Sequence, residues 1–141
     1  MNANCFIDTN IFVYAHDQKD LLKRDKARRL IIDLQADGRG VISYQVIQEF
    51  AHVMLKKLKP AMLIEECEDI ILQAMSPMLR VQSSLELFQS ALSIKSHTGY
   101  QWYDSLMLAA ALQVKCSIFY SEDLQHQALV RGMKIINPFE S

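Results

Sequence analysis

Residues 5–10 read CFIDTN, in which three apolar side chains precede an acid, a hydroxyl and an amide. A short and wholly apolar run is typical of a parallel strand buried on both faces. We therefore predict a strand over residues 5–8, with Asp8 at its carboxyl end, where open α/β sheets bind their ligands. The stretch also allows a second interpretation, in which Asp8 caps a helix that begins at Thr9 or Asn10.

Beyond this stretch, short apolar runs alternate with longer segments whose apolar residues recur at helical spacing. Further strands are predicted at 41–43, 79–81, 117–120 and 134–136. Helices are predicted at 20–35, 44–58, 60–74, 84–94, 102–114 and 124–130. Strands separated by helices imply right-handed crossovers. The prediction is one α/β domain over residues 1–141, with a short, mostly parallel central sheet covered by helices on both faces.

The composition is that of an ordinary globular domain, because 50% of the 141 residues are apolar and 22% are charged. A formal net charge of −1 provides no overall positive field, so any nucleic-acid binding must use a local patch. The three cysteines lack metal-ligand spacing. No signal peptide and no apolar run of about 20 residues is evident, so we expect a cytoplasmic protein without membrane contact.

Four acids from separate segments are predicted to meet at one edge of the sheet. Asp8 and Asp123 follow predicted strands, Glu49 lies early on the helix after the second strand, and Asp104 opens a very apolar helix. Each acid alone has a simpler explanation, as a helix cap, a first-turn acid or a solvated side chain. Together, clustered carboxylates repel one another unless a cation lies between them. Oxygen-only ligands suit Mg²⁺ or Mn²⁺.

Several motifs then carry a family resemblance that covers essentially the whole chain in the family's order. They are CFIDTN, the Gln48-Glu49 pair, WYDS at 102–105, SEDLQH at 121–126 and IINPF at 135–139. With these motifs the chain resembles PIN-domain ribonucleases and, more narrowly, the VapC-like toxins of bacterial toxin–antitoxin pairs. The resemblance implies a Mg²⁺- or Mn²⁺-dependent endoribonuclease that is inhibited by a cognate antitoxin and forms a homodimer.

The resemblance also implies roles for individual residues. The metal and the attacking water would be held by Asp8, Glu49, Asp104 and Asp123. Polar contacts around them would come from Thr9, Ser121 and Asn10, the last of which would orient the loop at Asp8. Glu122 matches no usual acid of the family and ranks below Asp123. The chain departs from the family at Gln125-His126-Gln127, where relatives often have a glycine, which puts the path of this loop in doubt.

Basic residues crowd the first long helix and the end of the helix at 44–58. The simple explanation is a pair of solvated faces. The functional one is contact with RNA phosphates, for which the first helix offers Lys19, Lys23, Arg24 and Arg28. In the sequence, no Arg or Lys adjoins any of the four acids. We therefore assign most of the electrostatic stabilisation of the reaction to metal.

Two other classes of protein remain open at this point. A non-catalytic metal- or RNA-binding module with the same fold would keep these residues without the reaction. A phospho-aspartate phosphatase or receiver domain also places an acid after its first strand. Such a phosphatase typically has a second Asp where Asn10 stands, and a receiver has a Lys where Asn137 precedes Pro138.

Overall fold

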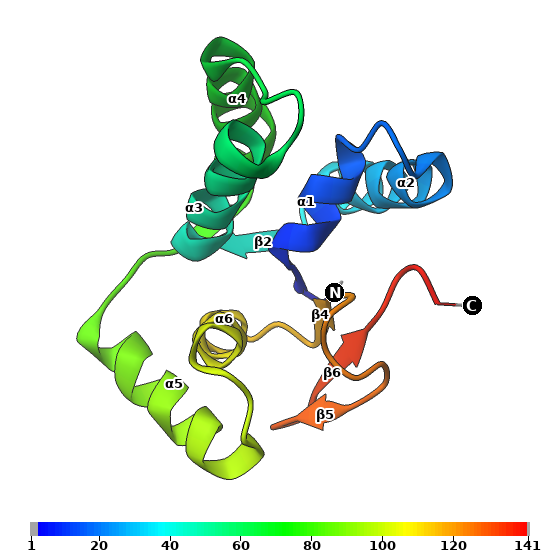
Figure 1. The fold of residues 1–141 in the computed structure, drawn as a ribbon. Helices are drawn as coiled ribbons and strands as arrows, with labels where there is room; N and C mark the ends of the chain where they lie inside the picture. The colour runs from blue at the N-terminus through cyan, green and yellow to red at the C-terminus, as the bar shows by residue number, and fades with distance from the viewer. Residues whose placement is uncertain (1–2, 141) are drawn as a thin grey trace.

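The computed structural model describes residues 3–140, which are built around a sheet in the strand order β3-β2-β1-β4-β6-β5 (Figure 1). The strands are β1 Cys5–Ile7, β2 Gly40–Ser43, β3 Leu79–Val81, β4 Ile118–Tyr120, β5 Leu129–Val130 and β6 Met133–Ile136. Neighbouring strands pair in parallel except at one edge, where β5 runs antiparallel to β6. The predicted α/β class with a mostly parallel sheet is confirmed.

The strand order reverses direction between β1 and β4. From β1 the chain moves outward through β2 to β3, and it then returns to place β4 on the other side of β1. The parallel register pairs Ile7 with Tyr120, and the amide of Asp8 donates a hydrogen bond to the Tyr120 carbonyl at 3.0 Å. Asp8 and Ser121 therefore leave adjacent strands side by side, at the kind of switch point where α/β sheets bind ligands.

Helices cover both faces of this sheet (Figure 1). They are α1 Thr9–Ala15, α2 Leu21–Asp37, α3 Tyr44–His52, α4 Ile64–Ile70, α5 Leu85–Thr98 and α6 Trp102–Gln113. Two π-helical segments, η1 Val53–Lys57 and η2 Ile71–Met75, extend α3 and α4, and a 3₁₀ turn, η3, covers Ser76–Met78. The α1 helix packs on α2 and α3, whereas α5 packs on α6 across the sheet. Within residues 3–140, no helix is both long and apolar enough to cross a bilayer.

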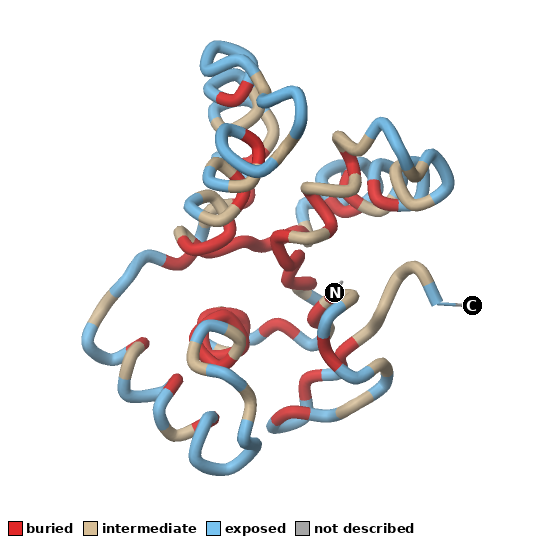
Figure 2. Tube along the Cα trace, viewed as in Figure 1, coloured by how far each residue is buried: buried red, intermediate tan, exposed pale blue. Residues whose placement is uncertain are grey.

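The core lies between these layers, along the strands and α6 (Figure 2). The rings of Phe6 on β1 and Phe119 on β4 stack with centroids 5.0 Å apart, and both side chains are buried. Every residue of α6 from Ser105 to Ala111 is buried, as its apolar sequence predicts. The strand ends that carry the acids are therefore fixed by tightly packed neighbours.

Two of the predicted helices are wrong in whole or in part. The helix predicted to begin at Pro60 begins at Ile64, because the amide of Met62 donates to the Met54 carbonyl at 2.9 Å and folds this loop back onto η1. The helix predicted at 124–130 does not form. Gln127 and Arg131 adopt positive φ angles of 69° and 49°, so this segment makes turns around the short strand β5.

Candidate active site

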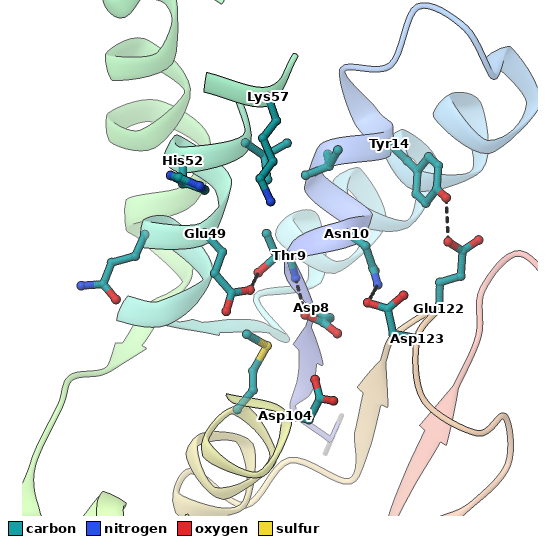
Figure 3. A pocket seen from close by; sticks show the side chains of 14 residues that line it. Asp8, Thr9, Asn10, Tyr14, Glu49, His52, Lys57, Asp104, Glu122 and Asp123 are labelled. Carbon is teal, nitrogen blue, oxygen red and sulfur yellow. Dashed lines mark hydrogen bonds between the residues drawn. The ribbon is translucent and has the colours of Figure 1, made fainter. Parts of the chain in front are cut away.

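A pocket of about 610 Å³ opens at the switch point, between α1, α3, α6 and the loop after β4 (Figure 3). The acids predicted to converge all line it: Asp8, Glu49, Asp104 and Asp123. In Figure 3 the side chains of Asp8, Asp104 and Asp123 border one space, and that of Glu49 extends from α3. The topology thus brings together acids that are separated by up to 115 residues of sequence.

Asp8 is the most buried of these acids, and it both follows β1 and precedes α1. It caps α1, with Oδ1 accepting a hydrogen bond from the Thr9 amide at 2.6 Å, while Oδ2 accepts one from Ser121 Oγ at 2.7 Å. Burial raises the pKa of Asp8 to about 7. The hydrogen bonds act against this rise, and the charges of Asp123 and Glu49 add to it. A buried carboxylate beside like charges favours a cation in the same space.

Glu49 is held in place by two side chains from different helices. Its Oε1 accepts a hydrogen bond from Thr9 Oγ1 at 2.9 Å, and its Oε2 accepts one from Gln45 Nε2 at 2.8 Å. Gln45 also donates to the Tyr103 carbonyl at 3.0 Å, which ties α3 to the start of α6. Thr9 therefore contacts two of the acids, through its amide and its hydroxyl.

The loop after β4 places the third acid. Asn10 Nδ2 donates to Asp123 Oδ2 at 3.0 Å, so Asn10 orients this carboxylate rather than the loop at Asp8. The Asp123 amide donates to Ser121 Oγ at 3.2 Å, and this hydroxyl in turn donates to Asp8. In the first turn of α6, burial raises the pKa of Asp104, and repulsion from Asp123 and Glu49 adds to the rise.

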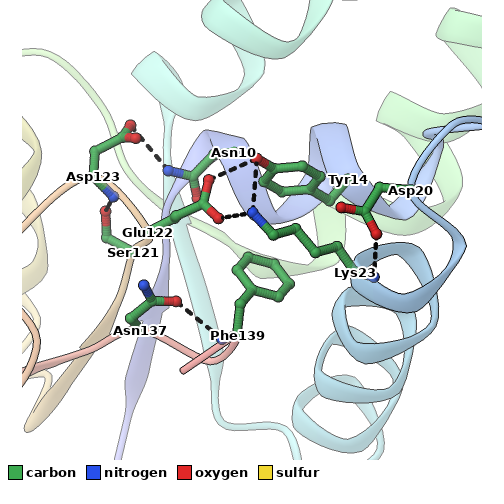
Figure 4. Close-up of polar contacts among 9 residues, drawn as sticks. All are labelled: Asn10, Tyr14, Asp20, Lys23, Ser121, Glu122, Asp123, Asn137 and Phe139. Carbon is green, nitrogen blue, oxygen red and sulfur yellow. Dashed lines mark hydrogen bonds and ion pairs between the residues drawn. The ribbon is translucent and has the colours of Figure 1, made fainter. Parts of the chain in front are cut away.

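Glu122 also lines the pocket, but its carboxylate points away from Asp123, toward Tyr14 and Lys23 (Figure 4). It forms an ion pair with Lys23 and accepts a hydrogen bond from the Tyr14 hydroxyl at 2.6 Å. The Lys23 ammonium lies 4.7 Å from the centroid of the Tyr14 ring and 5.4 Å from that of Phe139. This cluster compensates the charge of Glu122, in line with its lower rank as a metal ligand.

The predicted RNA-binding residues of the first long helix fall into two groups. Lys23 is engaged by Glu122, and Arg24 Nε lies 3.3 Å from Asp25 Oδ1. Lys19 and Arg28, in contrast, line a second cavity next to the acidic pocket. The structure therefore separates four residues that the sequence groups together.

The donor set of the pocket fits a hard divalent cation. Its acids offer only oxygen ligands, and burial, with added repulsion from neighbouring acids, raises the pKa values of Asp8 and Asp104. The Oδ1 atom of Asn10 is buried without a hydrogen-bond partner in residues 3–140. In that range no three His, Cys, Asp or Glu side chains are close enough to hold an ion as they stand. The set is thus chemically suited to a cation but not closed around one.

Sequence reasoning did not place His52 or Lys57 in the pocket wall. His52 lies one turn after Glu49 on α3, and Lys57 ends η1. Lys57 is the only Lys or Arg among the lining residues. The sequence did not indicate that Lys57 lines the same pocket as Glu49, because in a regular α-helix the eight positions between them would turn Lys57 about 80° away from Glu49.

Comparison with known proteins places the chain in a family. The model of the PIN domain matches residues 5–131, and the chain belongs to that family. The resemblance to PIN domains is confirmed, and the phospho-aspartate alternatives are set aside. No curated protein matches the sequence.

Solved structures share the fold at low sequence identity. A toxin–antitoxin complex from Klebsiella pneumoniae has a TM-score of 0.65 at 18% identity, covering 98% of this chain and 100% of that one. The sarcin–ricin loop cleaving toxin VapC20 of Mycobacterium tuberculosis has a TM-score of 0.61 at 18% identity, covering 85% and 92%. FitAcB from Neisseria gonorrhoeae has a TM-score of 0.65 at 12% identity, covering 97% and 99%. This chain is therefore similar in fold to proteins of toxin–antitoxin systems.

Proposed function

We propose that this protein is a Mg²⁺- or Mn²⁺-dependent endoribonuclease that hydrolyses RNA phosphodiester bonds. The observation that carries the proposal is the gathering of Asp8, Glu49, Asp104 and Asp123 around one pocket at the switch point. Membership of the PIN family supports it. The similarity in fold to a toxin that cleaves the sarcin–ricin loop suggests RNA as the substrate.

In this proposal, the four acids hold the ion or ions. A bound divalent ion lowers the pKa of its water and stabilises the negative charge that develops on the phosphate. The remaining residues set the positions of the acids. Ser121 and the Thr9 amide fix Asp8, the Thr9 hydroxyl fixes Glu49, and Asn10 fixes Asp123. These contacts hold Asp8, Glu49 and Asp123 at the pocket before substrate arrives, which favours catalysis by preorganisation.

The test is cleavage of a pool of structured RNAs by the purified protein with Mg²⁺ or Mn²⁺. We expect discrete cuts that disappear in EDTA and fall at least about 100-fold in rate in Asp104→Asn, because the charge of one ligand is lost. Asp69→Asn, which makes the same change on the exposed surface of α4, serves as the control. Cuts that persist unchanged in EDTA or in Asp104→Asn would contradict the proposal.

The same comparisons support a toxin role with an antitoxin partner. Its support in the molecule is a set of exposed apolar side chains around α4, since Leu63, Ile64 and Leu72 are 69%, 72% and 56% exposed. We propose that a cognate antitoxin covers this surface in the cytoplasm and that the toxin forms a homodimer. Growth arrest on expression that is absent in Asp8→Asn tests the toxin role, and the mass of the purified protein in solution tests the homodimer.

The alternative is a non-catalytic metal- or RNA-binding PIN module. One observation favours it, namely that the acids are not close enough to hold an ion as they stand. The two functions differ in a simple outcome of the cleavage experiment. Binding of RNA without cuts at any Mg²⁺ or Mn²⁺ concentration would favour the module, whereas metal-dependent cuts would exclude it.

A further inference from the structure

A second cavity of about 610 Å³ adjoins the acidic pocket, and the two share Val13 and Lys57 as lining residues. It lies between α1, α2 and the turn that follows η1. The charges of the two cavities are opposite. Five carboxylates and one lysine line the first cavity, whereas the second has two carboxylates and four cations. These cations are Lys19, Arg28, Lys57 and Lys59, and we call the second cavity the basic groove.

We propose that the basic groove binds the backbone phosphates of the RNA strand next to the bond that is cut, with Lys57 at the junction of the two cavities. This inference rests on the proposed ribonuclease function and adds the path of the substrate to it. The acidic pocket by itself repels a polyanion, so an RNA strand that enters the pocket must be held by cations nearby. The groove places four of them directly beside it.

Lys57 reaches the junction because η1 is π-helical. An α-helix would rotate residues 49 and 57 about 80° apart, since eight residues make more than two turns. The wider π turn, closed by a hydrogen bond from the Leu58 amide to the Val53 carbonyl at 2.9 Å, takes more residues per turn and reduces this offset. In Figure 3 the Lys57 amine accordingly points into the space between α3 and α1.

The charges of the groove are available to a ligand. Lys57 takes part in none of the ion pairs found in residues 3–140. Arg28 Nε donates to the Ala15 carbonyl at 2.7 Å, which anchors the side chain and leaves the two terminal nitrogens of its guanidinium for phosphate. Of the two acids in the groove, Asp17 accepts a hydrogen bond from the Lys19 amide at 2.7 Å. Burial, followed by the charge of Arg28, lowers the pKa of His16 in the same wall, so His16 adds no charge at neutral pH.

The test measures binding of a fluorescein-labelled, single-stranded 12-nucleotide RNA of mixed sequence by anisotropy, in EDTA, over a series of salt concentrations. We expect Lys57→Gln to raise Kd at least fivefold and to reduce the slope of log Kd against log salt by about 0.7, the value for one lost phosphate contact on a single strand. A variant that combines Lys19→Gln with Lys59→Gln should reduce the slope of log Kd against log salt by about twice as much. Lys26→Gln, on an exposed position of α2 outside both cavities, should leave Kd and slope unchanged.

The outcomes separate the groove from the nuclease. If Lys57→Gln binds the RNA like Lys26→Gln, the groove is not an RNA site, even where the wild type cuts RNA. If the variants weaken binding as expected but the wild type never cuts, the groove stands and the proposed reaction fails. Displacement of the RNA by a 12-residue poly-glutamate peptide at the same concentration as unlabelled RNA would overturn the inference in favour of an acidic protein ligand.

Discussion

The Ser121 hydroxyl donates a hydrogen bond to Asp8 Oδ2 at 2.7 Å, although 113 residues of sequence separate the two. The bond joins the carboxyl ends of β1 and β4, the adjacent strands at which the sheet reverses its order. Both side chains are buried, and Ser121 Oγ also accepts the Asp123 amide. One hydroxyl thus sets the relative position of two of the proposed metal ligands.

We expect Ser121→Ala to weaken Mn²⁺ binding roughly tenfold, the lower end of the usual cost of losing a partner of a metal ligand. At pH 8 it should also lower the free energy of unfolding by about 1–2 kcal/mol, because the buried Asp8 carboxylate loses a donor. Calorimetric titration with Mn²⁺ and urea unfolding measure the two effects. Ser117→Ala, at an exposed position just before β4, is the matched control. Equal Mn²⁺ affinity in the two variants would contradict this role of Ser121.

The raised pKa of Asp8 predicts an unusual dependence of stability on pH in the metal-free protein. The folded state keeps a proton on Asp8 up to about pH 7, whereas the unfolded chain releases it near 3.8. Folding therefore takes up a proton within this window, and stability falls as pH rises through it. In EDTA, we expect the wild type to lose about 2 kcal/mol relative to Asp8→Asn between pH 5 and pH 8. If the difference in unfolding free energy between the two proteins stays constant with pH, burial does not raise the pKa of Asp8 in the folded protein.

The two acids of the SEDLQ motif should differ sharply when they are changed. We expect Asp123→Asn to reduce RNA cleavage at least about 100-fold, because it removes charge from the metal centre. Glu122→Gln should retain most of the activity, because the Glu122 side chain faces Lys23 and Tyr14. Its cost in unfolding free energy should stay within about 1 kcal/mol, since the ion pair is partly exposed to solvent. Equal losses of cleavage in the two variants would place Glu122 in the metal centre.

The sequence was a good guide where short apolar runs end in polar residues. The strands at β1, β2, β3, β4 and β6 were predictable because buried parallel strands carry a strong local signal. The convergence of Asp8 and Asp123 followed from the same pattern. The predicted helix at 124–130 was wrong because its few apolar residues lie in turns and in the two-residue strand β5. The turns need positive φ angles at Gln127 and Arg131, and neither position carries the glycine that would have indicated such a turn in the sequence.

Contacts that depend on tertiary geometry could not be predicted. The pairing of Lys23 with Glu122 joins residues 99 positions apart, and nothing in the local pattern of the first long helix distinguishes Lys23 from Lys19. The place of Lys57 depends on a π turn, for which the sequence carries no recognised signal. The acids could be identified because the chemistry restricts their type. The sequence offered Lys19 and Arg28 as RNA contacts, but it could not separate them from Lys23 and Arg24, because surface lysines and arginines are common.

The most direct measurement for the whole account is calorimetric titration with Mn²⁺ at pH 8. It compares the wild type with four variants, Asp8→Asn, Glu49→Gln, Asp104→Asn and Asp123→Asn. The account predicts measurable binding by the wild type, at least tenfold weaker binding in each variant, and wild-type affinity in the control Asp69→Asn. Wild-type affinity in two or more of the four variants, or no binding by the wild type at millimolar Mn²⁺, would contradict a metal centre built from these acids.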